Sequence, residues 1–225
     1  MKSITILKYL LFISAVFTVL IFFIYHTSAW PLGLEALESL ITFLSLIGFL
    51  ISIQIFRNKL LTQENNISKG LLIGLLWTVE IGMNNIIQPR LPLRDHLDNI
   101  FWAIIAVLIL FVSVQASYKT NKFSTGVFAG LFSGFASGAV ACLTALTLIL
   151  LGMHLLLTDA INIAEWKGLL NQEYYRNMSV YFAYQTMAGA IMHLIILGAV
   201  MGLLLGLIGG GIGKLSAHVR SKRNS

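Results

Sequence analysis

The sequence predicts an all-α integral membrane protein that crosses the bilayer six times. Hydrophobic residues make up 57% of the 225-residue chain, charged residues make up only 11%, and the mean hydropathy is +0.85. Soluble domains carry about 25% charged residues, so most of this chain must lie in lipid or against other lipid-embedded helices. The apolar stretches are too long for the strands of a transmembrane barrel, which leaves helices as the spanning elements.

Six apolar stretches are long enough to cross a hydrocarbon core of about 30 Å. They cover residues 5–25, 34–56, 70–87, 99–118, 126–153 and 180–213, within a single membrane domain over residues 1–225. The third stretch is short and the last two are long, which predicts tilted or protruding helices there. The apolar run from Tyr9 to Tyr25 exceeds the core of a secretory signal peptide, so we expect an uncleaved anchor.

Lysine and arginine residues show which side of the membrane each loop occupies. With the N-terminus inside, eleven of the fifteen fall in inner segments and four in outer loops. The positive-inside rule therefore predicts that the N- and C-termini are both cytoplasmic, in the plasma membrane or, for a bacterial chain, the inner membrane. The same rule explains the net charge of +6, so we expect no nucleic-acid partner.

Glycine recurs at every fourth position, with one gap, in three of the predicted spans. The members are Gly70, Gly74 and Gly82 in the third span, Gly126, Gly130, Gly134 and Gly138 in the fifth, and Gly198, Gly202, Gly206 and Gly210 in the sixth. Residues four apart share a helix face, and faces of small residues let membrane helices approach closely. We therefore predict that the fifth and sixth spans meet as an antiparallel pair, glycine to glycine, with the third packed centrally beside them. A pore or sliding surface lined by exposed backbone is the alternative.

Polar residues interrupt two of these spans near mid-membrane. Glu80 and Asn84 are four apart and share a face of the third span, where an acid costs about 2.5–3.5 kcal/mol on insertion scales. His193 lies at a similar depth in the sixth span, about 160° from the centre of its glycines. We predict a buried cluster of Glu80, Asn84 and His193, with Asn85 and Gln185 nearby.

This cluster suggests two classes of function. Ionisable residues inside a membrane commonly mark ion or proton sites, which favours a small channel or transporter for a cation or a proton-coupled solute. A hydrogen-bonded cluster that only sets helix register is the structural alternative. The second class is a non-transporting membrane subunit or sensor that binds partner proteins through its glycine faces and outer loop, or assembles as a homo-oligomer. The sequence contains no recognisable catalytic, metal-binding or cofactor-binding motif, so we expect neither an enzyme nor a cofactor.

The outer loops carry helix start and stop signals. Pro89 and Pro92 predict that the third helix ends near Gln88, and Asp95 or Asp98 is a candidate cap for the fourth.

A further helix is expected in the longest outer loop, over residues 159–175. Thr158 or Asp159 is its candidate cap, and the apolar residues Ile163, Trp166 and Leu170 recur at helical spacing. Aromatic residues in this segment favour a helix that lies on the outer membrane surface.

Overall fold

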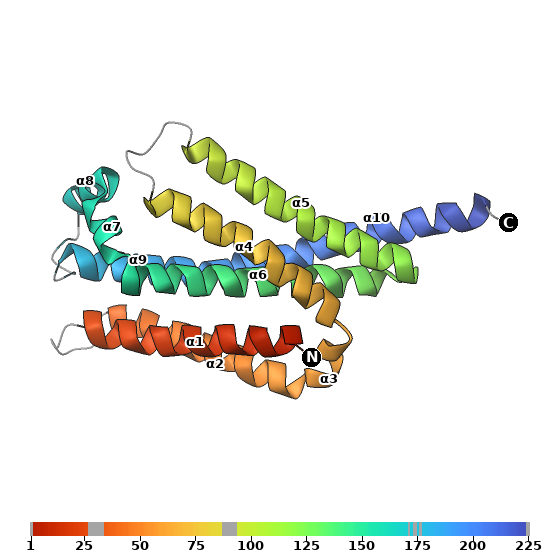
Figure 1. The fold of residues 1–225 in the computed structure, drawn as a ribbon, viewed down its shortest axis with the longest axis horizontal. Helices are drawn as coiled ribbons and strands as arrows, with labels where there is room; N and C mark the ends of the chain where they lie inside the picture. The colour runs from red at the N-terminus through yellow and green to blue at the C-terminus, as the bar shows by residue number, and fades with distance from the viewer. Residues whose placement is uncertain are drawn as a thin grey trace.

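The computed structural model describes residues 2–26, 34–86, 94–170, 172, 175 and 177–223. This part of the chain is all-helical and contains no strand (Figure 1). Its principal helices are α1 (Lys2–Tyr25), α2 (Leu34–Ile55), α3 (Arg57–Leu61), α4 (Glu64–Ile86), α5 (Arg94–Thr120), α6 (Phe123–Leu151), α7 (Met153–Thr158), α8 (Ala160–Gly168), α9 (Met178–Met192), the π-helix η2 (His193–Val200) and α10 (Met201–Arg223).

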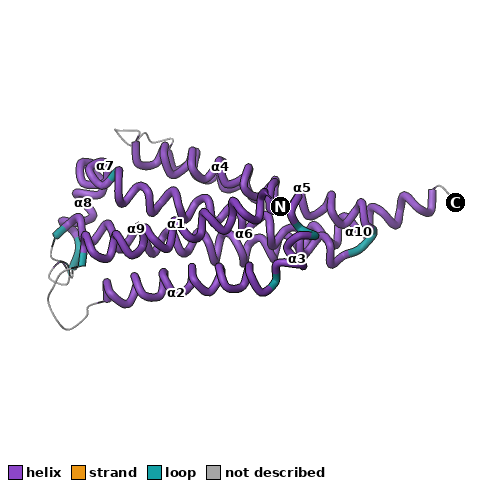
Figure 2. Tube along the Cα trace, turned by 60° about the horizontal axis from the view of Figure 1, so that its bottom comes forward, coloured by secondary structure: helices purple, strands orange, loops and turns teal. Residues whose placement is uncertain are grey.

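The long helices run along the long axis of the molecule, and successive long helices run in opposite directions (Figure 1). The start of α1 and the end of α10 consequently point to the same end of the bundle. Figures 1 and 2 both show α7 and α8 at the opposite end, and both show the last turns of α10 projecting beyond the other helices. We call the end of the bundle that holds the two termini the terminal end.

Five helices of the described part are long and apolar enough to cross a membrane. They comprise α1, α6, most of α2 and α5, and the continuous helix formed by α9, η2 and α10. The remaining long helix, α4, runs beside them but carries Lys69 and Glu80 and is less apolar. The architecture is compatible with an all-α, multi-pass membrane protein.

The core of the bundle is built around α6. In its most apolar stretch 61% of the residues are buried, against 22–33% in the other four candidate spans. One face of α6 packs with α1, α2 and α9 in a cluster that includes the fully buried Tyr184 and Leu146. Another packs with α4 and α5 in a cluster that includes Trp77 and Ile109. The helix with the most small residues is therefore surrounded on several sides.

Several helix ends differ from the predictions. The stretch predicted over residues 126–153 is broken at Gly152, whose N–H bonds to Leu148 and which separates α6 from α7. Asp98 cannot cap the fourth span, because α5 already begins at Arg94 and Asp98 lies inside it. The side chain of Asp95 and the predicted helix end near Gln88 lie outside the described residues.

The predicted outer helix over residues 159–175 exists in part, as α8. Asp159 caps it: its Oδ1 accepts hydrogen bonds from the N–H groups of Ile161 at 2.9 Å and Asn162 at 3.1 Å. The helix ends at Gly168, because the next residue, Leu169, has an extended backbone with ψ of 120°.

Candidate functional site

Glu80 and Asn84 form a hydrogen-bonded pair on α4. The Glu80 side chain is only 6% exposed, and its Oε1 accepts a hydrogen bond of 2.7 Å from Asn84 Nδ2. The two residues are one helical turn apart, so the bond is local to α4. It offsets part of the cost of removing the carboxylate from water.

Trp77, one turn before Glu80, brings α4 into contact with two other elements. It is 3% exposed, and its ring lies edge-on to Trp102 of α5, with centroids 5.5 Å apart. It also lies edge-on to the imidazole of His193, with centroids 5.0 Å apart and an interplanar angle of 89°. His193 thus meets α4 through an indole ring.

The second contact of His193 is within its own helix. Its Nδ1 lies 2.7 Å from the carbonyl oxygen of Gly189, and a neutral imidazole protonated at Nδ1 donates this bond. The interactions described for His193 therefore involve Trp77 and Gly189, whereas the described hydrogen bond of Glu80 involves Asn84. None of these joins the carboxylate to the imidazole.

Gln185, predicted to neighbour Glu80, has its described hydrogen bond with α8. Its Nε2 donates a 2.8 Å hydrogen bond to Glu165 Oε1 on α8, which also accepts a 2.7 Å bond from the Tyr181 hydroxyl. Tyr181 and Gln185 are one turn apart, so both face α8 and attach it to α9. Asn85 bonds to the carbonyl of Ile81 on its own helix at 2.7 Å. The described hydrogen bonds thus join Glu80 to Asn84 and link Asn85, Gln185 and His193 to other groups.

The π-helix η2 lies between His193 and the glycines of α10. At the end of η2 the N–H of Met201 bonds to the carbonyl of Ile196, five residues back, as well as to that of Gly198. A turn closed this way holds more residues than the 3.6 of an α-helix, so it changes the direction in which earlier side chains point. The predicted angle of 160° between His193 and the glycines assumed a regular α-helix, and that assumption is wrong.

The continuous helix of α9, η2 and α10 stays against α6 along its length. Buried positions recur at Ala190, Leu194, Gly198 and Gly202. At η2 a Cβ built on Gly138 of α6 would lie 2.5 Å from the carbonyl oxygen of His193. The recurrence at every fourth residue is the same in the regular helix α6, so it does not reveal η2 in the sequence.

The glycines of α6 and α10 bring the two backbones into direct contact. A Cβ built on Gly126 would lie 2.5 Å from the Cα of Gly210, and one built on Gly134 would lie 2.7 Å from the Cα of Gly202. Between them, Gly130 faces Gly206 in the same way. The pairing is antiparallel, because residue numbers rise along α6 as they fall along α10.

α4 contacts α6 through its own glycines. A Cβ built on Gly70 would lie 2.7 Å from the Cα of Ser133, and one built on Gly74 would lie 2.6 Å from the Cβ of Val140. Gly82 is half-buried near the other end of α4.

Two serines outside the predicted glycine faces and polar cluster join α5 to the contact of α6 with α10. Ser113 Oγ lies within hydrogen-bonding distance of two carbonyl oxygens, Gly126 at 2.7 Å and Gly206 at 3.0 Å, and Ser117 Oγ donates to Gly210 at 2.7 Å. Both serines are fully buried. Their spacing of four within an apolar span was the available signal. We call the contact of α5, α6 and α10 the glycine–serine seam.

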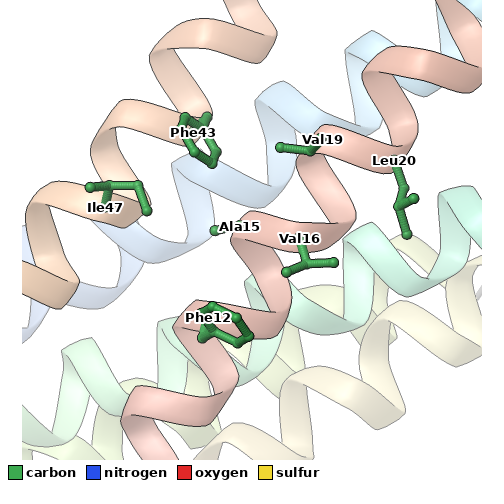
Figure 3. Close-up of a pocket in the computed structure, with 7 residues that line it drawn as sticks. All are labelled: Phe12, Ala15, Val16, Val19, Leu20, Phe43 and Ile47. Carbon is green, nitrogen blue, oxygen red and sulfur yellow. The ribbon is translucent and has the colours of Figure 1, made fainter.

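An apolar groove lies between α1 and α2 (Figure 3). Its lining consists of apolar side chains only, namely Phe12, Ala15, Val16, Val19, Leu20, Phe43 and Ile47. Such a groove offers no polar group to orient a charged solute. Among the described residues, no group of three or more His, Cys, Asp or Glu side chains is placed to hold a metal ion.

Comparison with known proteins adds no relative: no protein family, no curated protein and no solved structure matches this chain.

Proposed function

We propose that the chain crosses the plasma membrane six times, with both termini in the cytoplasm and α4 as the additional crossing. The 23 residues of α4 measure about 34 Å at 1.5 Å per residue, and the 17 residues after Lys69 measure about 26 Å, which covers most of a hydrocarbon core of about 30 Å. Its buried Glu80 faces protein, and its glycines lie against α6. The excess of lysine and arginine in the inner segments supports this orientation.

Within that membrane, we propose that the protein is a non-transporting subunit or sensor that acts through a partner protein. The observation that carries the proposal is that the described hydrogen bonds join these polar residues in two separate pairs, Glu80 with Asn84 within α4 and Gln185 with Glu165 between α9 and α8. A transport path requires polar groups that follow one another across the membrane, at a site between helices. The described polar contacts and the apolar groove do not supply such a succession.

The glycine faces serve the chain's own packing in this proposal. Because Gly126, Gly130 and Gly134 lie against α10, they are not accessible to a partner. The partner surface we propose instead is the outer element formed by α7 and α8, which Glu165 holds on α9. It displays exposed apolar and charged side chains, including Ile161 and Lys167.

Cross-linking in native membranes tests the partner surface. The single native cysteine, Cys142, is buried, so a Lys167→Cys variant carries one reactive thiol at the outer surface. We expect a thiol-reactive cross-linker to produce one defined heavier species with Lys167→Cys. The matched control is Ser216→Cys, at an exposed position of α10 on the terminal end. The same heavier species from both variants, or none from either, would contradict the assignment of the partner surface to α8.

Cation or proton transfer at Glu80 is the second candidate function, favoured by a nearly fully buried carboxylate on α4. Proteoliposomes loaded with pH-sensitive or cation-sensitive dyes distinguish the two. The first proposal predicts no flux above empty liposomes for the native chain or for Glu80→Gln. Flux that the native chain supports and Glu80→Gln abolishes would establish the second candidate and overturn the first.

A further inference from the structure

Two lysines lie where α4 and α5 meet at the terminal end. Lys69 is half-buried, and its Nζ donates a 2.6 Å hydrogen bond to Gln115 Oε1 on α5. Lys119 follows Gln115 by four residues, so it lies one turn nearer the end of α5 on the same face. The two ammonium groups therefore flank one place at the edge of the α4–α5 contact.

Their positive charges are not balanced by the described contacts. The amide oxygen of Gln115 is a hydrogen-bond acceptor without net charge. Partial burial, and then the positive charge of Lys119, lower the pKa of the Lys69 ammonium. An anion beside both lysines would remove this repulsion and compensate for the lost hydration of Lys69.

The acidic residue at the start of α4 does not serve as that anion. Glu64 precedes Lys69 by five residues, which turns it about 140° away around the helix. Its Oε1 accepts a hydrogen bond from the N–H of Ser3 on α1, on another side of α4.

The position of the two lysines indicates which kind of anion would bind beside them. Lys69 directly precedes the apolar stretch predicted over residues 70–87, and Lys119 lies in the last turn of α5. Both are thus at headgroup depth if these helices span the bilayer. Basic pockets between membrane helices on the cytoplasmic side bind anionic headgroups.

We propose that Lys69, Gln115 and Lys119 form a binding site for the headgroup of an anionic phospholipid. The two ammonium groups bind phosphate oxygens through charge-assisted hydrogen bonds. Because Gln115 Oε1 accepts from Lys69, its Nε2 amide protons are directed elsewhere and supply a further donor. The site goes beyond the proposed function and is compatible with either candidate.

Native mass spectrometry of the purified, delipidated full chain tests the site. The protein is titrated with phosphatidylglycerol and, separately, with phosphatidylcholine of the same chain length. We expect Lys69→Gln and Lys119→Gln each to weaken phosphatidylglycerol binding about fivefold, the effect of one basic residue near an anionic surface, and to leave phosphatidylcholine binding unchanged. Lys69→Arg keeps the charge and should keep most of the affinity.

The matched control is Lys122→Gln, which removes one exposed charge at the same end of the bundle. An equal loss with Lys122→Gln would show a diffuse basic surface, and no loss with Lys119→Gln would exclude the site. Lys119 is exposed, so its variant preserves packing and carries the test if Lys69→Gln fails to fold. Displacement of the lipid by inorganic phosphate at equal concentration would assign the site to a free anion and overturn the lipid assignment.

Discussion

Gly134 and Gly202 lie so close that neither position has room for a side chain. A Cβ on Gly134 would lie 2.7 Å from the Cα of Gly202, and a Cβ on Gly202 would lie 3.0 Å from the Cα of Gly134. Backbone atoms on both sides cannot move aside as the end of a flexible side chain does. Lipid supplies no hydrophobic drive between helices, so such contacts hold the bundle together through dispersion and hydrogen bonds.

Replacing Gly202 by alanine should therefore separate α10 from α6. We expect the free energy of unfolding to fall by about 1–3 kcal/mol, the usual cost of forcing extra atoms into a packed interior. Thermal unfolding in detergent measures it. The control is Gly211→Ala on the same helix, where an added Cβ has no neighbour within 4 Å. That variant should be neutral or gain up to about 1 kcal/mol from helix propensity, and equal losses for the two variants would contradict the packing argument.

Ser113→Ala tests the hydrogen bonds of the glycine–serine seam. The substitution removes one hydroxyl that lies 2.7 Å from Gly126 O and 3.0 Å from Gly206 O, and it leaves the backbone in place. Interhelical hydrogen bonds in membranes contribute about 0.6 kcal/mol on average, with a maximum near 1.7. We therefore expect the free energy of unfolding to fall by an amount within that range. Ser216→Ala is the control, since Ser216 is exposed and bonds within its own helix. A Ser113→Ala variant as stable as the native chain would show that packing alone holds the seam.

Glu80→Gln and Glu80→Leu test whether the hydrogen bond between Glu80 and Asn84 stabilises the protein. Glutamine retains an oxygen that can accept from Asn84, so its unfolding temperature should stay close to that of the native chain. Leucine removes this acceptor from the half-buried Asn84, and we expect the free energy of unfolding to fall by about 1–3 kcal/mol. If Glu80→Leu is as stable as Glu80→Gln, the hydrogen bond to Asn84 contributes nothing to stability.

The sequence was sufficient for the helical class because scarce charge and long apolar runs leave few alternatives in lipid. It was less informative about where helices end. Hydropathy marks where a chain leaves lipid, whereas α10 continues in helical form to Arg223, beyond the predicted limit at Gly213. The shorter α8 reflects the extended backbone at Leu169, which the apolar spacing of that loop does not reveal.

At the candidate site, sequence spacing predicts contacts within one helix better than contacts between helices. The bond between Glu80 and Asn84 follows from their separation of four on one helix. The contact of His193 with Trp77 joins two helices, and spacing within one helix does not specify it. The partner of Gln185 is Glu165, which comes from a loop whose docking depends on tertiary contacts.

Asp159 offers the last test, at the junction of α7 and α8. Its Oδ1 accepts from two backbone N–H groups of the first turn of α8, which would otherwise lack a partner within the helix. Asp159→Ala should destabilise the start of α8 by about 1 kcal/mol, whereas Asp159→Asn retains a capping oxygen and should change little. Hydrogen exchange at Ile161 and Asn162 measures the effect, because loss of the cap exposes these amides first. Faster exchange confined to α8 would establish local capping, and unchanged exchange in Asp159→Ala would show that contacts with α9 alone hold the helix.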